Sequence, residues 1–117
     1  MRPATRILIV DDEPNARNAL SELLRDEGYE VSSAVDGAAA QARLAEFRPD
    51  VLLTDVHMPG VDGLGLLATA RGMSNGGPAI VLMSARPQPR GVDEPFIGKP
   101  IDIDQLLATV QRALRRR

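Results

Sequence analysis

Short apolar runs in this sequence end in polar side chains that could take part in phosphoryl transfer. Three carboxylates, one hydroxyl and one ammonium follow four such runs. These side chains are Asp11 and Asp12, then Asp55, Ser84 and Lys99. If the runs are parallel strands of one sheet, their carboxyl ends meet at a single rim, which is where ligands bind in sheets of this kind. The pattern therefore predicts one polar site assembled from four separate segments.

The three carboxylates predict a bound metal ion. Carboxylates that crowd together repel each other, and a buried unpaired charge is costly. Mg²⁺ relieves both costs because it prefers oxygen ligands. We expect Asp12 and Asp55 to bind Mg²⁺ directly, and Asp11 to bind it directly or through water.

Asp55 is in addition a candidate nucleophile, since an aspartate can accept a phosphoryl group as an acyl phosphate. Lys99 would then pair with one phosphoryl oxygen, and Ser84 would donate a hydrogen bond to another. Lys99 is the only lysine of the chain, which favours a specific role for it.

Each of these residues also has a structural interpretation when it is taken alone. An acid after a strand is commonly the N-cap of the next helix, and Asp12 fits that role. Ser84 could be a turn residue, and Lys99 could be solvated. The functional interpretation rests on the joint pattern, in which every strand end carries a group that phosphoryl chemistry uses.

The elements that would hold these side chains alternate between strand and helix. Wholly apolar runs are typical of strands buried on both faces, and the stretches between them have helical periodicity. Strands are predicted over residues 7–10, 29–34, 51–53, 79–83 and 96–97, and helices over 14–27, 38–47, 64–70 and 102–116. Asp36 is predicted to make a turn or a helix cap, and Asp102 is predicted to cap the last helix in a capping box with Gln105. This alternation predicts right-handed crossovers and a parallel sheet covered by helices on both faces.

Length and composition limit the alternatives. The 117 residues, 44% of them hydrophobic, suit one domain over residues 1–117, with no room for a second. The net charge of −2 argues against general nucleic-acid or membrane affinity, and the absence of cysteine excludes thiol chemistry. No apolar run approaches the roughly 20 residues that span a bilayer, and no secretion signal is evident. We therefore expect a cytoplasmic protein without direct nucleic-acid or membrane partners.

The motifs around the polar residues resemble the response-regulator receiver family of two-component signalling. They are Asp11-Asp12, the run from Asp55 to Gly63 with the sequence DVHMPGVDG, Ser84-Ala85, and Lys99-Pro100. Their order, spacing and strand context match over essentially the whole chain, and they are specific in combination. The resemblance implies a flavodoxin-like α/β fold with five parallel strands in the order 2-1-3-4-5.

The resemblance also implies partners and a role for each matching residue. The phosphoryl donor would be a sensor histidine kinase or a phosphotransfer protein, and a downstream protein would receive the signal. The implied roles are phosphorylation for Asp55; Mg²⁺ binding for Asp11, Asp12, Asp55 and the backbone carbonyl of His57; phosphate contact for Ser84 and Lys99; an aromatic switch for Phe96; and a cis peptide before Pro100.

The stretch from Arg86 to Pro95 departs from the family pattern. Family members usually place a full helix between the strand that ends in the hydroxyl and the strand that ends in the lysine. This stretch is about two helical turns shorter than such a helix needs, and it contains three prolines and a glycine. We predict a loop or a single turn, so the fourth helix of the family would be shortened or absent and the usual output surface cannot be assumed.

Two side chains near the motifs have alternative interpretations. His57 is the only histidine, and no acidic partner is evident for it in the sequence, so a loop side chain beside the pocket is favoured over a phosphohistidine or a metal ligand. Phe96 lacks the hydroxyl that a tyrosine would expose to solvent, so it has less reason to leave the core. Two interpretations of Phe96 therefore remain: a core residue, or an aromatic switch that changes rotamer.

Three functions fit these features to different degrees. The favoured one is a phosphorylation-dependent signalling switch. The alternative is a pseudo-receiver, in which the same fold acts as a phosphorylation-independent interaction module. A phosphatase with an aspartyl-phosphate intermediate is disfavoured, because such enzymes commonly place a second acid where this chain has His57. We expect no enzyme activity beyond the chain's own phosphorylation and dephosphorylation.

Overall fold

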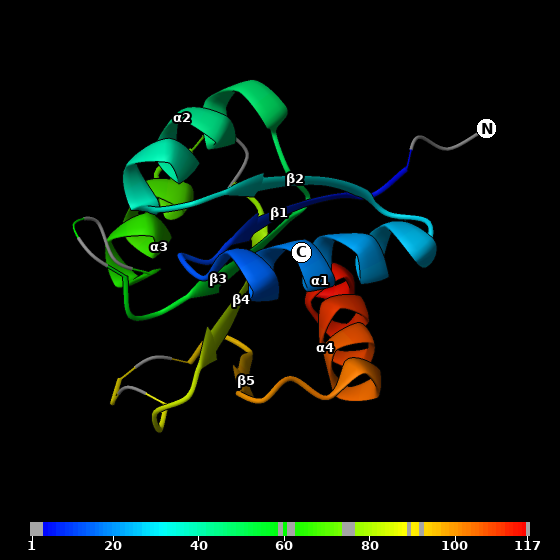
Figure 1. Ribbon diagram of the computed structural model, residues 1–117. Helices are drawn as coiled ribbons and strands as arrows, with labels where there is room; N and C mark the ends of the chain where they lie inside the picture. The colour runs from blue at the N-terminus through cyan, green and yellow to red at the C-terminus, as the bar shows by residue number, and fades with distance from the viewer. Residues whose placement is uncertain are drawn as a thin grey trace.

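A five-stranded parallel sheet forms the centre of the molecule (Figure 1). The computed structural model describes residues 4–58, 60, 63–73, 77–88, 90–91 and 93–116. The strands are β1 (Arg6–Val10), β2 (Glu30–Ala34), β3 (Val51–Asp55), β4 (Ala79–Ser84) and β5 (Phe96–Gly98). Their order in the sheet is β2-β1-β3-β4-β5, and every neighbouring pair is parallel. The predicted fold class and strand order are confirmed.

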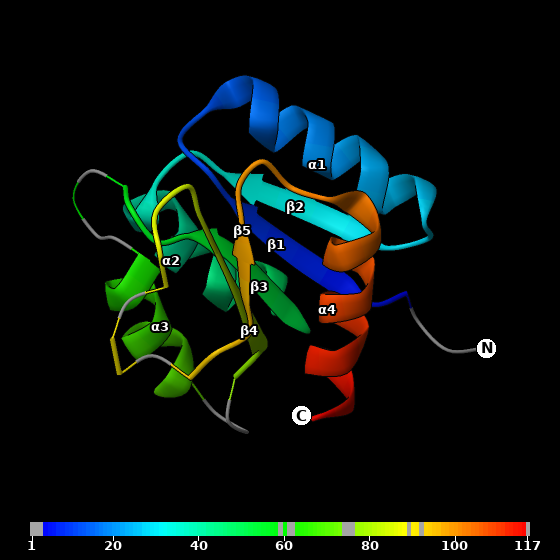
Figure 2. The same cartoon turned by 90° about the horizontal axis from the view of Figure 1, so that it is seen from below.

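Helices cover both faces of this sheet. They are α1 (Pro14–Asp26), α2 (Gly37–Phe47), α3 (Gly63–Arg71) and α4 (Ile103–Arg115). Figure 2 shows α1 and α4 on one face and α2 and α3 on the other. Successive strand residues point to opposite faces, so Leu8 and Leu52 belong to the core beneath α2 and α3, whereas Ile9 and Leu53 belong to the core beneath α1 and α4.

Acidic side chains begin three of the helices. Asp36 and Asp102 each accept a hydrogen bond from the main-chain amide three residues further on, at 2.8 and 3.1 Å, which confirms both predicted caps. At α1 the cap is Glu13, whose carboxylate accepts from the amides two and three residues on. The N-cap interpretation of Asp12 is therefore wrong, because the turn between β1 and α1 is one residue longer than a cap at Asp12 would require.

The connection between β4 and β5, residues 85–95, contains no helix among its described residues. A turn at Arg90–Gly91 is its only regular feature within that part, and Gly91 adopts the positive φ of 76° that favours glycine. Pro89 and Val92 lie outside the described residues. The prediction of a loop or a single turn is confirmed for the described part of this β4–β5 connection.

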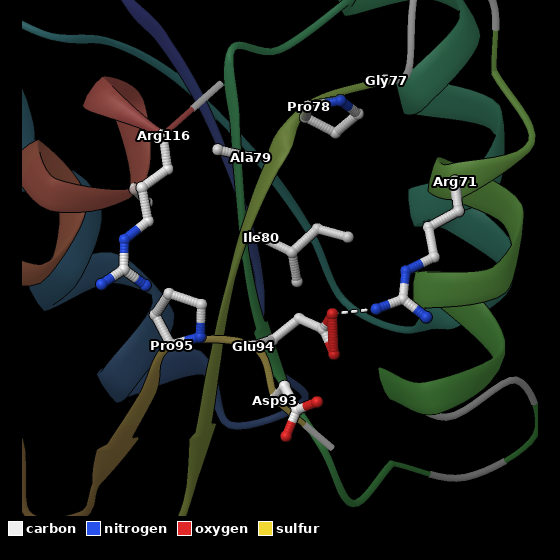
Figure 3. A pocket seen from close by; sticks show the side chains of 10 residues that line it. Arg71, Gly77, Pro78, Ala79, Ile80, Asp93, Glu94, Pro95 and Arg116 are labelled. Atoms are coloured by element: carbon white, nitrogen blue, oxygen red, sulfur yellow. Dashed lines mark hydrogen bonds and ion pairs between the residues drawn. The ribbon is translucent and has the colours of Figure 1, made fainter. Parts of the chain in front are cut away.

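A hollow of about 400 Å³ lies beside the end of the β4–β5 connection (Figure 3). The end of α3, the start of β4 and the end of α4 form its walls. An ion pair joins Arg71 of α3 to Glu94 of the connection. Strand β5 pairs with the segment from Leu82 to Ser84, so the end of the connection is held both to α3 and to the sheet.

Candidate functional site

The sheet topology brings the polar residues of the four strand ends to one edge. Parallel strands end on the same side, so the termini of β1, β3, β4 and β5 lie side by side. We call these residues the carboxyl-end rim; they are Asp11, Asp12, Asp55, Ser84 and Lys99.

Lys99 joins the two most buried carboxylates of the rim. Its Nζ donates to Asp55 Oδ2 at 2.8 Å and to Asp11 Oδ2 at 3.0 Å. The Asp11 side chain is completely buried, the Asp55 side chain is 11% exposed and the Lys99 side chain is 23% exposed. The other carboxylate oxygen of Asp11, Oδ1, accepts the amide of Glu13 at 2.9 Å. A single ammonium thus offsets two buried negative charges.

Burial and pairing move the pKa values of this pair in a definite direction. Burial raises the pKa of Asp55 above its ordinary 3.8, and this effect outweighs the hydrogen bond from Lys99, which lowers it. Burial alone would lower the pKa of Lys99, but its hydrogen bonds to Asp55 and Asp11 outweigh that effect, so the pKa of Lys99 is raised above 10.5. Lys99 therefore stays charged at neutral pH, and the rim carries more negative charge than one ammonium can balance.

The donor set of the rim fits a hard divalent cation. Oxygens from the side chains of Asp11, Asp12 and Asp55 lie within 4.8 Å of one another. Asp12 is exposed, whereas Asp11 and Asp55 are buried, so one carboxylate faces water while two line the interior. Oxygen donors around an excess of negative charge are the ligands that Mg²⁺ prefers.

Ser84 is connected to the β4–β5 connection. The residue is 2% exposed, and its Oγ accepts a 3.0 Å hydrogen bond from the main-chain amide of Arg86. Its carbonyl oxygen accepts the amide of Lys99 at 2.8 Å. Ser84 is therefore in contact with both the lysine of the rim and the first residues of the connection.

Other residues to which the family resemblance gave a role lie next to the rim, against the core or in the link after β5. His57 is exposed next to the rim. Phe96 is half-buried and packs against the core beneath α2 and α3. The peptide between Lys99 and Pro100 is cis. Within the motif after Asp55, the positions Pro59, Val61 and Asp62 lie outside the described residues.

Three further residues support the rim, and none of them has a role of its own predicted from the sequence. Arg17 Nη1 donates to the carbonyl oxygen of Asp11 at 2.8 Å, and the buried Thr54 Oγ1 donates to the carbonyl oxygen of Asp55 at 3.0 Å. At Gly63, a Cβ atom would lie 2.4 Å from the same Asp55 oxygen, so only glycine fits there. Arginine is common in this chain and threonine is ordinary in a strand, so only the glycine of the motif carried a signal.

An apolar groove opens beside the rim, between α1 and the link from β5 to α4. It has a volume of about 310 Å³. Asp11 and Lys99 lie in its wall together with Leu20, Leu23 and Ile103. Ile103 is 47% exposed. We call this feature the α1 groove.

Comparisons with known proteins agree with the geometry. The family model described as the response regulator receiver domain matches residues 7–111. The transcriptional regulatory protein PrrA of Mycobacterium leprae is 38% identical over 96% of this chain and 51% of its own length. Among solved structures, the chemotaxis protein CheY4 of Vibrio cholerae is similar with a TM-score of 0.86 and 30% identity over 95% of this chain and 99% of that one. The receiver domain from the hybrid histidine kinase CckA is similar with a TM-score of 0.80 and 40% identity, over 93% of this chain and 98% of that one.

The extent of these matches differs between the two kinds of relative. The chain spans about half the length of PrrA, but nearly the whole of the CheY4 and CckA receiver structures. Among the described residues, no helix is both long and apolar enough to cross a membrane.

Proposed function

Because this chain belongs to the response regulator receiver domain family, we propose that it is a phosphoryl-accepting switch with Asp55 as the acceptor. The observation that carries the proposal is the pair of hydrogen bonds from Lys99 to Asp55 and Asp11, at 2.8 and 3.0 Å. They hold an aspartate with a raised pKa at the end of a buried strand, beside two further carboxylates.

The reaction transfers a phosphoryl group from a phosphohistidine to Asp55. A carboxylate oxygen of Asp55 attacks phosphorus, the P–N bond breaks, its electron pair stays on the imidazole, and an acyl phosphate forms. Lys99 holds Oδ2, which leaves Oδ1 to attack. After transfer, the Lys99 ammonium is placed to pair with a phosphoryl oxygen.

Asp11, Asp12 and Asp55 would hold Mg²⁺, with the backbone carbonyl of His57 as a further ligand by family resemblance. When bound, Mg²⁺ offsets the negative charge of the carboxylates and of the phosphoryl oxygens. Both side-chain oxygens of Asp11 already accept hydrogen bonds, from Glu13 and Lys99. Contact between Asp11 and the ion through water therefore fits better than a direct bond.

The signal would leave the site through Ser84. Its hydroxyl accepts the amide of Arg86, so a Ser84 side chain that turns to donate to a phosphoryl oxygen would pull on the first residues of the β4–β5 connection. Phe96, which starts β5 at the other end of the connection, would adjust its half-buried ring in response.

The phosphoryl donor would dock in the α1 groove. The groove is apolar, and Asp11 and Lys99 of the rim lie in its wall, so a donor seated there would bring its phosphohistidine to Asp55. A sensor histidine kinase or a phosphotransfer protein in the cytoplasm is the donor that the family implies, and a downstream protein rather than nucleic acid is the proposed target of this domain.

Labelling with a small acyl phosphate such as acetyl phosphate tests the acceptor. In the presence of Mg²⁺, we expect the intact mass to rise by one phosphoryl group, and the Asp55→Asn variant to incorporate none. Asp93→Asn, which removes an exposed acid of the β4–β5 connection, should label like the wild type. Equal labelling of Asp55→Asn and the wild type would exclude Asp55 as the acceptor.

Docking of the donor is tested separately with Ile103→Ser in the α1 groove. This variant should label normally from acetyl phosphate but more slowly from a phosphorylated histidine phosphotransfer domain, because only the protein donor uses the groove. Equal slowing with both donors would show that Ile103 acts on the rim itself and would contradict the docking proposal.

One observation favours the pseudo-receiver as a second candidate. The described part of the β4–β5 connection lacks the helix through which the family usually reaches its output. In that case, a partner would bind with the same affinity whether or not the rim carries beryllium fluoride, an acyl-phosphate mimic. A change in partner affinity on adding the mimic with Mg²⁺ would exclude the pseudo-receiver.

A further inference from the structure

Arg17 makes a contact that the proposed reaction does not use. Its guanidinium donates from Nη1 to the main-chain carbonyl of Asp11 at 2.8 Å. Side chains of a helix lean toward its N-terminus, which lets Arg17 reach back from the first turns of α1 past the cap at Glu13. A charged donor at this distance makes a strong hydrogen bond.

The carbonyl held by Arg17 belongs to the peptide that joins Asp11 to Asp12. A peptide is planar, so fixing its oxygen fixes the plane from which the Asp12 side chain projects. The Asp11 carboxylate has its own restraints, from Glu13 and Lys99. The exposed Asp12 carboxylate has no hydrogen-bond partner among the described residues, so its direction depends on the backbone that Arg17 holds.

We propose that Arg17 is a positioning residue for the metal site, which aims the Asp12 carboxylate at the ion by fixing the Asp11–Asp12 peptide. This role rests on the proposed binding of Mg²⁺ at the carboxyl-end rim. Groups that orient metal ligands in this way contribute to metal affinity without touching the metal.

The direction of the change in Mg²⁺ affinity distinguishes a positioning role of Arg17 from an effect of its charge alone. Arg17 carries a positive charge at the main chain of Asp11, on the rim, so removing that charge alone would make the rim more negative and tighten Mg²⁺ binding. Releasing the Asp11–Asp12 peptide would instead let Asp12 move away from the ion and weaken binding. The two explanations therefore predict opposite changes for the same variant.

The test is a titration of the whole chain with Mg²⁺, followed by the amide resonances of residues 11–13 and without any phosphoryl donor. Arg17→Met keeps an apolar stem of similar length and removes the donor; we expect Mg²⁺ binding to weaken by roughly 10-fold. The matched control is Arg25→Met. It removes the same charge from the same helix and breaks an equivalent contact, from Arg25 Nη2 to the carbonyl of Val31 at 3.3 Å, away from the rim.

The control variant should bind Mg²⁺ like the wild type. Thermal unfolding of both variants in the absence of metal measures any loss of stability separately from the binding constant, and Arg17→Gln replaces Arg17→Met, with the same expected sign, if the latter does not fold. Unchanged or tighter binding by the Arg17 variant would overturn the positioning role while leaving the proposed function intact. A wild-type chain that binds no Mg²⁺ would contradict the proposed function and this role together.

Discussion

The carboxyl-end rim and the β4–β5 connection meet at Ser84, yet different forces hold them. In the rim, Lys99 bonds two buried carboxylates that come from β1 and β3. In the connection, the described residues from 85 to 93 are all exposed, and the ion pair between Arg71 and Glu94 is largely solvated on the arginine side, whose side chain is 59% exposed. Buried charges tolerate little change in geometry, whereas exposed loops and ion pairs tolerate a good deal.

The difference in burial means that the β4–β5 connection can vary without changing the geometry of the rim. A loop can change its length and sequence without disturbing strand ends that the sheet holds in place. The rim can therefore keep the side chains that we propose for phosphoryl transfer, while the described part of the connection has no helix. Ser84 is the residue through which a change in one region could reach the other, because it contacts both Lys99 and Arg86.

The largest effect is expected when the charge balance of the rim is broken. Lys99→Met leaves Asp11 and Asp55 buried without their cation, so the free energy of unfolding in metal-free buffer should fall by about 3 kcal/mol. Mg²⁺ should restore part of that loss, since it offsets the same charges. Urea unfolding with and without Mg²⁺ measures both quantities, and Lys99→Arg, which keeps the charge, is the control. A Lys99→Met variant as stable as the wild type without metal would contradict this account of the rim.

The pH dependence of stability tests the raised pKa of Asp55. A group whose pKa is raised by folding contributes stability below its ordinary pKa, here 3.8, and that contribution is lost as pH rises through the raised value. The stability of Asp55→Asn relative to the wild type should therefore increase between acid and neutral pH, because only the wild type loses this contribution. Unfolding of both proteins in metal-free buffer at several pH values measures the difference. A difference that shrinks as pH rises would mean that the pKa of Asp55 is lowered instead.

The junction between the two regions is tested at Ser84. Ser84→Ala removes the acceptor of a part-buried hydrogen bond from the Arg86 amide, so stability should fall by about 0.5–1 kcal/mol. Labelling of Asp55 should persist, but the amides of residues 85–88 should respond much less to the phosphoryl group. Ser84→Thr keeps the hydroxyl and should restore the response. An undiminished response in Ser84→Ala would show that the signal bypasses this hydroxyl.

The smallest effect is expected in the β4–β5 connection. Glu94→Gln breaks the pair with Arg71, which is partly exposed, so the free energy of unfolding should fall by about 0.5 kcal/mol while labelling of Asp55 stays unchanged. Glu46→Gln, which breaks the more exposed pair with Arg43 on α2, is the control for the loss of a surface ion pair. A marked change in labelling with Glu94→Gln alone would mean that the two regions are coupled more tightly than the contacts indicate.

The sequence was a good guide to the fold and to which side chains gather at the rim. An apolar run that ends in Asp55 or Lys99 predicts both a buried strand and the polar side chain at its carboxyl end. Parallel pairing of the strands then brings those polar side chains together. Helix periodicity and the caps at Asp36 and Asp102 set the boundaries of helices to within one or two residues. The three prolines between Arg86 and Pro95 predicted that no full helix forms there, because proline opposes helix formation locally, and the described part of the connection contains none.

What sequence reasoning missed are contacts between side chains and the main chain. Asp12 was a reasonable N-cap by residue type, but Glu13 is the cap, because the length of the turn decides which acid reaches the free amides. Arg17 and Thr54 contact carbonyl oxygens of the rim, and any residue can supply a carbonyl, so neither contact leaves a pattern in the sequence. The hollow at the end of the β4–β5 connection is lined by residues from α3, the start of β4, the connection and the end of α4, and no sequence pattern shows that these segments meet.

The central claim is that phosphorylation at the rim is transmitted to the β4–β5 connection. The most direct test compares amide spectra of the wild-type chain with and without beryllium fluoride and Mg²⁺. We expect the amides of residues 11–13 and 55–57 in the rim, and those of residues 85–88 in the connection, to shift together along one titration curve. Shifts confined to the rim, with the connection unchanged at saturation, would contradict it.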